Sequence, residues 1–235
     1  MKPWLEGDLS DLDPRADLDR LRGVVLASAH RGEDLRALFA ALGKRDPRAA
    51  ADLAAGPRAV AHRNAVEGAL AAADSLETVL DPSGLYPRLI MLAPDVTAST
   101  LAFAFGRHPL ADWTIRLSRA HDPVPGKIHL DAAARVGRLR EASLLYARAG
   151  VLEGLLDRAA RGDVEPIGAL WRAGRTEEAL AAAAACLDAT PASPAIPALG
   201  ALAGPEIRGV LDALLARVTT ATAAERVRWA QVDAS

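Results

Sequence analysis

Helix start and stop signals recur along the whole sequence and constrain the fold more than any other feature. Asp13-Pro14 places a capping carboxylate before a proline, which is the pattern of a helix N-terminus, and Leu18 and Leu21 follow at helical spacing. Residues 85–106 also contain β-branched and aromatic side chains that suit strands, but an isolated strand would lack a partner. The sequence therefore predicts an all-α fold.

The same signals divide the chain into expected helices and two regions. A break at "HDPVPG", residues 121–126, predicts an N-terminal helical region over 1–122 and a second helical region over 123–235. A capping box at Thr222–Glu225 is expected to begin the last helix. The remaining expected helices cover residues 14–30, 35–42, 46–56, 58–80, 95–105, 109–120, 128–136, 139–149, 151–160, 164–173 and 176–189, with one more in "PEIRGVLDALLARV".

Two segments of the second region resemble each other at an offset of 37 residues: "GRLREASLLYARAG" from Gly137 and "GRTEEALAAAAACLDATP" from Gly174. Their pattern resembles the second helix of a tetratricopeptide repeat over residues 124–191. The resemblance implies antiparallel helical hairpins stacked into a right-handed superhelix. The matching positions are the turn glycines Gly137 and Gly174, the small residues Ala142, Ala149, Ala179 and Cys186, the large residue Tyr146, and the terminal Pro191.

The resemblance departs from the family pattern at three points. Ala183 stands where the second copy should have a large residue, Pro166 falls near the start of a first helix, and the first helices lack the expected aromatic residue and glycine. Residues 1–122 show no matching motif.

The resemblance also implies a binding groove lined by the first helix of each repeat. Arginine suits carboxylates, and tryptophan is a frequent anchor in protein interfaces. The groove would hold a segment of another protein, either acidic or aromatic, and would use no cofactor. Its expected residues are Lys127, Asp131, Arg135, Val164, Trp171 and Arg172. A second interpretation assigns Trp171 to the core and the arginines to solvated helix ends.

Composition narrows the function classes. The chain has 235 residues, a net charge of −2 and a single cysteine, so a nucleic-acid-binding surface, a disulfide and a cysteine-built zinc site are not expected. The longest apolar run, residues 89–93, is too short for a membrane span, and the acidic first residues do not suit a secretory signal. The abundance of alanine and arginine is common in GC-rich bacterial genomes. We expect an interaction scaffold or adaptor in a bacterial cytoplasm.

Two other hypotheses remain open at this point. His108, His121 and His129, with nearby aspartates, are the best candidates for a metal or acid–base site, which would make the protein a small-molecule enzyme acting between the two halves. The alternative for these histidines is a capping role at helix ends, and His30 and His62 are interpreted as surface or helix-end residues. The third hypothesis is that the apolar segment 89–105 pairs with itself or with a partner.

Overall fold

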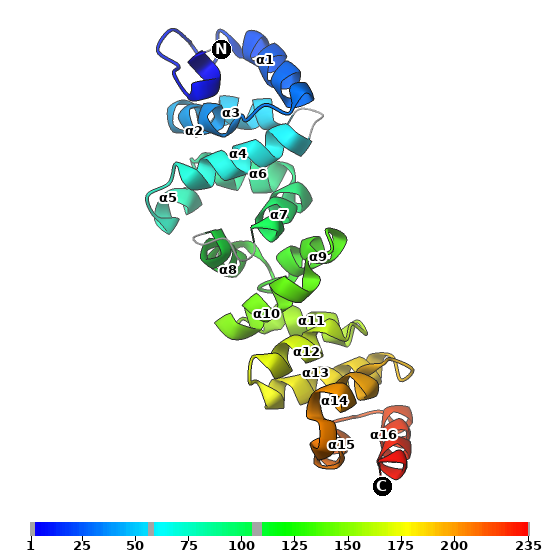
Figure 1. Ribbon diagram of the computed structural model, residues 1–235. Coiled ribbons are helices and arrows are strands. Elements are labelled where there is room, and N and C mark those ends of the chain that lie inside the picture. The colour runs from blue at the N-terminus through cyan, green and yellow to red at the C-terminus, as the bar shows by residue number, and fades with distance from the viewer. Residues whose placement is uncertain (1–2, 56–58, 105–109, 235) are drawn as a thin grey trace. The chain divides into compact units, whose positions relative to one another are not determined.

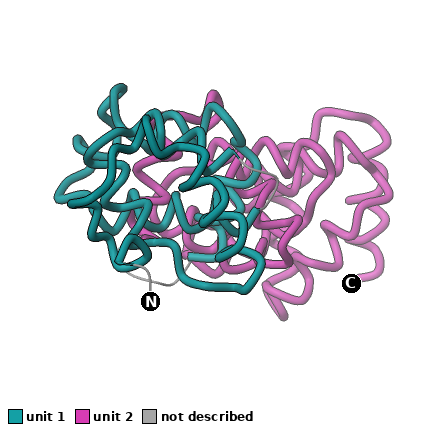
Figure 2. Tube along the Cα trace, turned by 90° about the horizontal axis from the view of Figure 1, so that it is seen from above, with its two compact units in different colours: residues 1–104 teal, residues 105–235 magenta. Residues whose placement is uncertain are grey.

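The computed structural model describes residues 3–55, 59–104 and 110–234, and over these residues it contains helices and no strand. The prediction of an all-α fold is confirmed. The chain forms two compact units, residues 1–104 and 105–235, shown in different colours in Figure 2. Within the described residues, none of the helices combines the length and the apolar character that crossing a lipid bilayer requires.

The first unit is built around α2, which packs against α3 and α4, and around α6, which packs against α3, α4 and α7. Leu38, Phe39 and Leu42 of α2 are fully buried in its core. Its elements are the 3-10 helix η1 (Pro3–Glu6) and the helices α1 (Leu18–Arg31), α2 (Arg36–Arg45), α3 (Pro47–Ala54), α4 (Ala59–Ala71), α5 (Leu76–Leu80), α6 (Leu85–Leu92) and α7 (Pro94–Phe103).

Capping side chains set two helix starts in this unit. Asp46 accepts hydrogen bonds from the backbone N–H groups of Arg48 and Ala49 at the start of α3, as its Asp-Pro signal predicts. The single helix expected over residues 58–80 is wrong, because Ser75 accepts a hydrogen bond from the Thr78 N–H and begins α5 separately from α4. The strand-like stretch forms two helices, α6 and α7.

The second unit contains α8 (Leu110–His121), α9 (Lys127–Arg135), α10 (Leu139–Ala149), α11 (Glu153–Ala160), α12 (Glu165–Arg172), α13 (Thr176–Ala189), α14 (Ala195–Ala203), the 3-10 helix η2 (Gly204–Glu206), α15 (Ile207–Leu215) and α16 (Ala221–Asp233). From α8 to α15, each helix packs against the next but one along the chain (Figure 1). The helices α9, α11, α13 and α15 therefore form one layer, and α8, α10, α12 and α14 form the other.

Two sequence-based boundaries can be compared with this unit. The boundary expected between residues 122 and 123 lies inside it, between α8 and α9, and α8 packs against both α9 and α10. The capping box expected to begin at Thr222 is wrong by two residues. Thr220 caps α16 by accepting a hydrogen bond from the Ala223 N–H, and Thr222 lies within the first turn.

Glycines permit two left-handed turns and one close approach between helices in the second unit. Gly137 and Gly174 have φ of 70° and 76°, the left-handed conformation that glycine adopts readily in turns. Gly154 allows α11 to approach the start of α9, and its N–H donates to the Pro125 carbonyl at 2.9 Å. A Cβ at Gly154 would lie 2.8 Å from three backbone atoms of residues 125–127, so this approach requires glycine.

The positions matched to the tetratricopeptide pattern are mostly buried. Ala142, Tyr146, Ala179 and Cys186 are each 0% exposed, whereas Ala149 is exposed, unlike its counterpart Cys186. The two matched segments form α10 and α13, which lie in different layers of the unit. The family resemblance itself stays a prediction.

Candidate functional site

The expected groove residues occupy two helices of the second unit. Lys127, Asp131 and Arg135 lie on α9, whereas Trp171 and Arg172 lie on α12, which Val164 directly precedes. Helix α9 packs against α10 and α11, and α12 packs against α10, α11, α13 and α14. The two groups of groove residues therefore belong to different layers.

Asp131 is the centre of an ion-pair network within the layer of α9 and α11. Its Oδ1 lies 2.6 Å from Arg158 Nη1 and 3.0 Å from Arg161 Nη2. Arg158 also donates from Nε to Asp163 Oδ2 at 2.9 Å, and its side chain is only 13% exposed. The Asp131 carboxylate thus balances two guanidinium groups, one on the neighbouring helix α11 and one directly after that helix.

Lys127 belongs to the same network. Its Nζ lies 3.3 Å from Asp157 Oδ1, and Asp157 Oδ2 lies 2.9 Å from Arg161 Nη2. Each of the two helices supplies a cation and an anion: Lys127 of α9 pairs with Asp157 of α11, and Asp131 of α9 pairs with Arg158 of α11. Lys127 and Asp131 stabilise the contact between these helices and have less capacity left for a partner.

The α12 side of the expected groove is more open. Trp171 is half-buried and Arg172 is exposed. Arg172 Nη2 lies 3.2 Å from Glu165 Oε1 of the same helix, and both side chains are about one-third exposed (35% and 33%). A solvent-exposed pair of this kind contributes little to stability, so a partner's carboxylate can displace Glu165 at low cost.

The predicted histidine cluster is only partly described. His108 lies outside the described residues, while His121 ends α8 and His129 lies in α9. His129 is 1% exposed, its Nδ1 lies 2.7 Å from the Tyr146 hydroxyl, and the ring also hydrogen-bonds the backbone of Thr114. Burial lowers the pKa of His129 to about 4, aided by the nearby His121, so its imidazole is neutral at pH 7.

Asp122 is a second buried titratable group at this corner. Its Oδ2 accepts a hydrogen bond from Ser118 Oγ at 3.0 Å, and Ser118 Oγ in turn accepts from the Gly126 N–H. Burial raises the pKa of the Asp122 carboxyl to about 6, although hydrogen bonds from Ser118 and the backbone of residues 126 and 128 oppose the rise. The group joins the end of α8 to the turn that begins α9.

The side chains at this corner have shifted pKa values, but they are closed to molecules in solution. Asp122 is 7% exposed and His129 is 1% exposed, so a dissolved substrate does not reach either side chain in this conformation. The part of the chain that the structure describes contains no group of three or more histidine, cysteine, aspartate or glutamate residues that could hold a metal ion. The arrangement of Asp122, Ser118, His129 and Tyr146 fits a buried polar connection between α8, α9 and α10.

The interpretation of His62 as a surface or helix-end residue is wrong. His62 is 4% exposed in α4, and its Nε2 lies 2.8 Å from Thr97 Oγ1 of α7, while the ring also hydrogen-bonds the backbone of Ala54. Burial lowers its pKa. His30, in contrast, is exposed near the end of α1, as expected.

Part of the apolar segment 89–105 is exposed. Met91 and Leu92, at the end of α6, are 83% and 51% exposed. Phe103 is 44% exposed at the end of α7, where the Arg63 guanidinium lies 5.3 Å from the centre of its ring. Phe105 lies outside the described residues.

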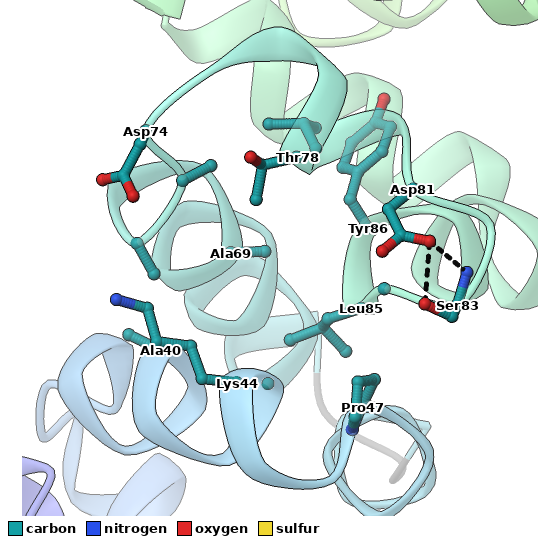
Figure 3. Close-up of a pocket in the computed structure, with 15 residues that line it drawn as sticks. Ala40, Lys44, Pro47, Ala69, Asp74, Thr78, Asp81, Ser83, Leu85 and Tyr86 are labelled. Carbon is teal, nitrogen blue, oxygen red and sulfur yellow. Dashed lines mark hydrogen bonds between the residues drawn. The ribbon is translucent and has the colours of Figure 1, made fainter.

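The first unit contains an open cavity of about 330 Å³ that sequence reasoning did not find. Figure 3 shows Lys44 and Asp74 on one side of it and Asp81 and Ser83 on the other. Asp81 Oδ1 accepts hydrogen bonds from both the N–H and the hydroxyl of Ser83, which lower the pKa of Asp81. Alanine and glycine supply six of the fifteen residues that line the cavity, and the polar side chains of Thr78 and Tyr86 line it as well. Its charged residues come from separate helices and turns, and no linear motif marks them.

Comparisons of the chain with protein-family models, with curated proteins and with solved structures find no match.

Proposed function

We propose that the protein is an interaction scaffold that binds a segment of another protein on the helical array of its second unit. The observation that supports this function best is the two-layered packing of α8 to α15. Arrays in which each helix contacts only near neighbours along the chain present long surfaces, and repeat proteins commonly bind their partners on such surfaces.

Helix α12 offers the most suitable part of that surface. Trp171 gives a half-buried aromatic anchor, and the adjacent Arg172 has a solvent-exposed partner that another carboxylate can replace. These two residues favour an acidic segment with an apolar side chain. Lys127 and Asp131 are paired with α11, so their part in the proposal is to hold α9 and α11 together and not to contact the partner.

The test is capture of binding proteins from the host lysate by wild-type protein and by Trp171→Ala and Arg172→Glu variants. Arg208→Glu is the matched control, because it makes the same charge change at an exposed arginine of α15 in the same unit. The proposal expects a protein that is retained by the wild type and the control and is lost with both α12 variants. Thermal unfolding checks that each variant is folded. Equal capture by all four proteins would contradict the proposed surface.

A further inference from the structure

The outward face of α16 carries an exposed tryptophan. Trp229 and Val232 are each 66% exposed, whereas Trp4, in the first unit, is 4% exposed. On the opposite side of α16, Ala223 and Val227 are fully buried, and the helix packs against α15 and α13. At about 100° per residue, Trp229 and Val232 lie about 60° apart and face away from this buried side.

The orientation of α16 is fixed by polar contacts, so the direction of this face is well defined. The Asp188 carboxylate of α13 accepts hydrogen bonds from the N–H and hydroxyl groups of Thr219 and Thr220, at 2.8 to 3.0 Å. Gln231 donates to Asp212 of α15 at 2.8 Å. The start and the end of α16 are both held on the unit, and Trp229 remains outside.

The charges on this face complement those of an antiparallel copy. Arg226 and Asp233 are both exposed and lie on the same edge of the face, about 20° apart around the helix and about 10 Å apart along it. If two α16 helices pack antiparallel about a two-fold axis between residues 229 and 230, Arg226 of each copy lies level with Asp233 of the other.

The apolar residues fit the same arrangement. The axis places Trp229 beside Trp229 of the other copy, displaced by about 1.5 Å along the helix, so the two indole rings can pack against each other. Arg228 of the other copy lies about 1.5 Å, one residue's rise, from the level of Val232, and its aliphatic stem can cover that side chain. When the face meets a second copy of itself, apolar residues therefore lie against apolar groups and each cation lies against an anion, as a two-fold interface requires.

We propose that the protein forms a two-fold symmetric dimer through antiparallel packing of α16, centred on Trp229 and closed by two reciprocal Arg226–Asp233 ion pairs. One helix pair buries less surface than a standard protein interface, and we expect a dimer of micromolar affinity. This inference does not depend on the proposed function of α12.

Sedimentation equilibrium of the full chain tests the dimer. Over about 1 to 500 µM, a range that brackets micromolar association, the wild-type mass is expected to rise from 24.6 kDa to twice that value. Trp229→Glu is expected to stay at the single-chain mass throughout. Met91→Glu, which makes the same kind of change at an exposed apolar residue of the first unit, is expected to dimerise like the wild type.

Charge reversal tests the antiparallel geometry. Arg226→Asp and Asp233→Arg each place like charges opposite each other and are expected to weaken the dimer about tenfold or more. An equimolar mixture of the two variants restores opposite charges at both positions and is expected to regain the wild-type mass. A wild type that stays at the single-chain mass, a Trp229→Glu protein that still dimerises, or a mixture no heavier than its components would overturn the proposal. Far-UV circular dichroism confirms that every variant keeps its helix content.

Discussion

Asp122 and His129 are expected to have opposite effects on the pH dependence of stability. Burial raises the pKa of Asp122 from 3.8 to about 6, so the folded state binds this proton more tightly than the unfolded chain does. The ionised carboxylate therefore lowers the free energy of unfolding above pH 6, by about 3 kcal/mol, and this penalty disappears as the pH falls from 6 to 3.8.

For His129 the sign is reversed. Burial lowers its pKa from 6.5 to about 4, so the unfolded chain binds this proton more readily. The contribution of neutral His129 is fully present above pH 6.5, and about 3 kcal/mol is lost as the pH falls from 6.5 to 4. In the wild type, the gain at Asp122 and the loss at His129 nearly cancel over this range.

Asp122→Asn removes the buried carboxyl group and, with it, the loss of stability that its ionisation causes above pH 6. The variant is expected to be more stable than the wild type at pH 7 and to lose about 3 kcal/mol relative to it as the pH falls from 7 to 4. His129→Gln is expected to show the opposite change relative to the wild type. Urea unfolding followed by circular dichroism at pH 4, 5, 6 and 7 gives these differences, in which the titration of all other carboxylates cancels. Parallel pH profiles for Asp122→Asn and the wild type would refute the reasoning.

Three further substitutions test other contacts by thermal or urea unfolding. Gly154→Ala is expected to lower the free energy of unfolding by about 2 to 3 kcal/mol, because the added Cβ meets the backbone of residues 125–127. Gly209→Ala, at a helical position where nothing lies within 4 Å of the added Cβ, is expected to stabilise by up to about 1 kcal/mol. Equal effects of the two substitutions would contradict the close approach. Asp131→Ala leaves the nearly buried Arg158 with one fewer carboxylate and is expected to cost about 2 kcal/mol, against at most about 1 kcal/mol for Glu165→Ala at the exposed pair. Thr97→Val removes the hydroxyl beside buried His62 and is expected to cost about 1 to 3 kcal/mol, and a neutral result would show that the ring does not depend on this contact.

The sequence predicts helices well where the signal is local. Asp46-Pro47 caps α3 as expected, and the ranges expected for α10 and α13 agree with the structure, because capping groups and turn glycines act within a few residues. The break between α4 and α5 was missed because the alanine-rich stretch before Ser75 suits a continuing helix equally well. The cap of α16 was misplaced because Thr220 and Thr222 are both plausible caps, and local sequence does not distinguish them.

The candidate site could be predicted only in part, because its side chains are positioned by partners distant in sequence. Asp131 was expected to face a groove, but its partner Arg158 lies on α11 and its partner Arg161 directly follows that helix, about one helical hairpin away. Spacing along α9 does not reveal these contacts. The burial of His62 and His129 likewise depends on packing against α7 and α10, which a single histidine in a helical pattern does not indicate.

The alternation of helices between two layers also limits how such an array changes in length. Because each helix packs against the next but one, removing two consecutive helices leaves every later helix in its original layer. Removing one helix moves all later helices to the opposite layer and exchanges their buried and solvent-facing sides. Insertions and deletions in the evolution of this unit should therefore be tolerated as pairs of helices, and an odd number should persist only where both faces of the following helices are compatible with burial.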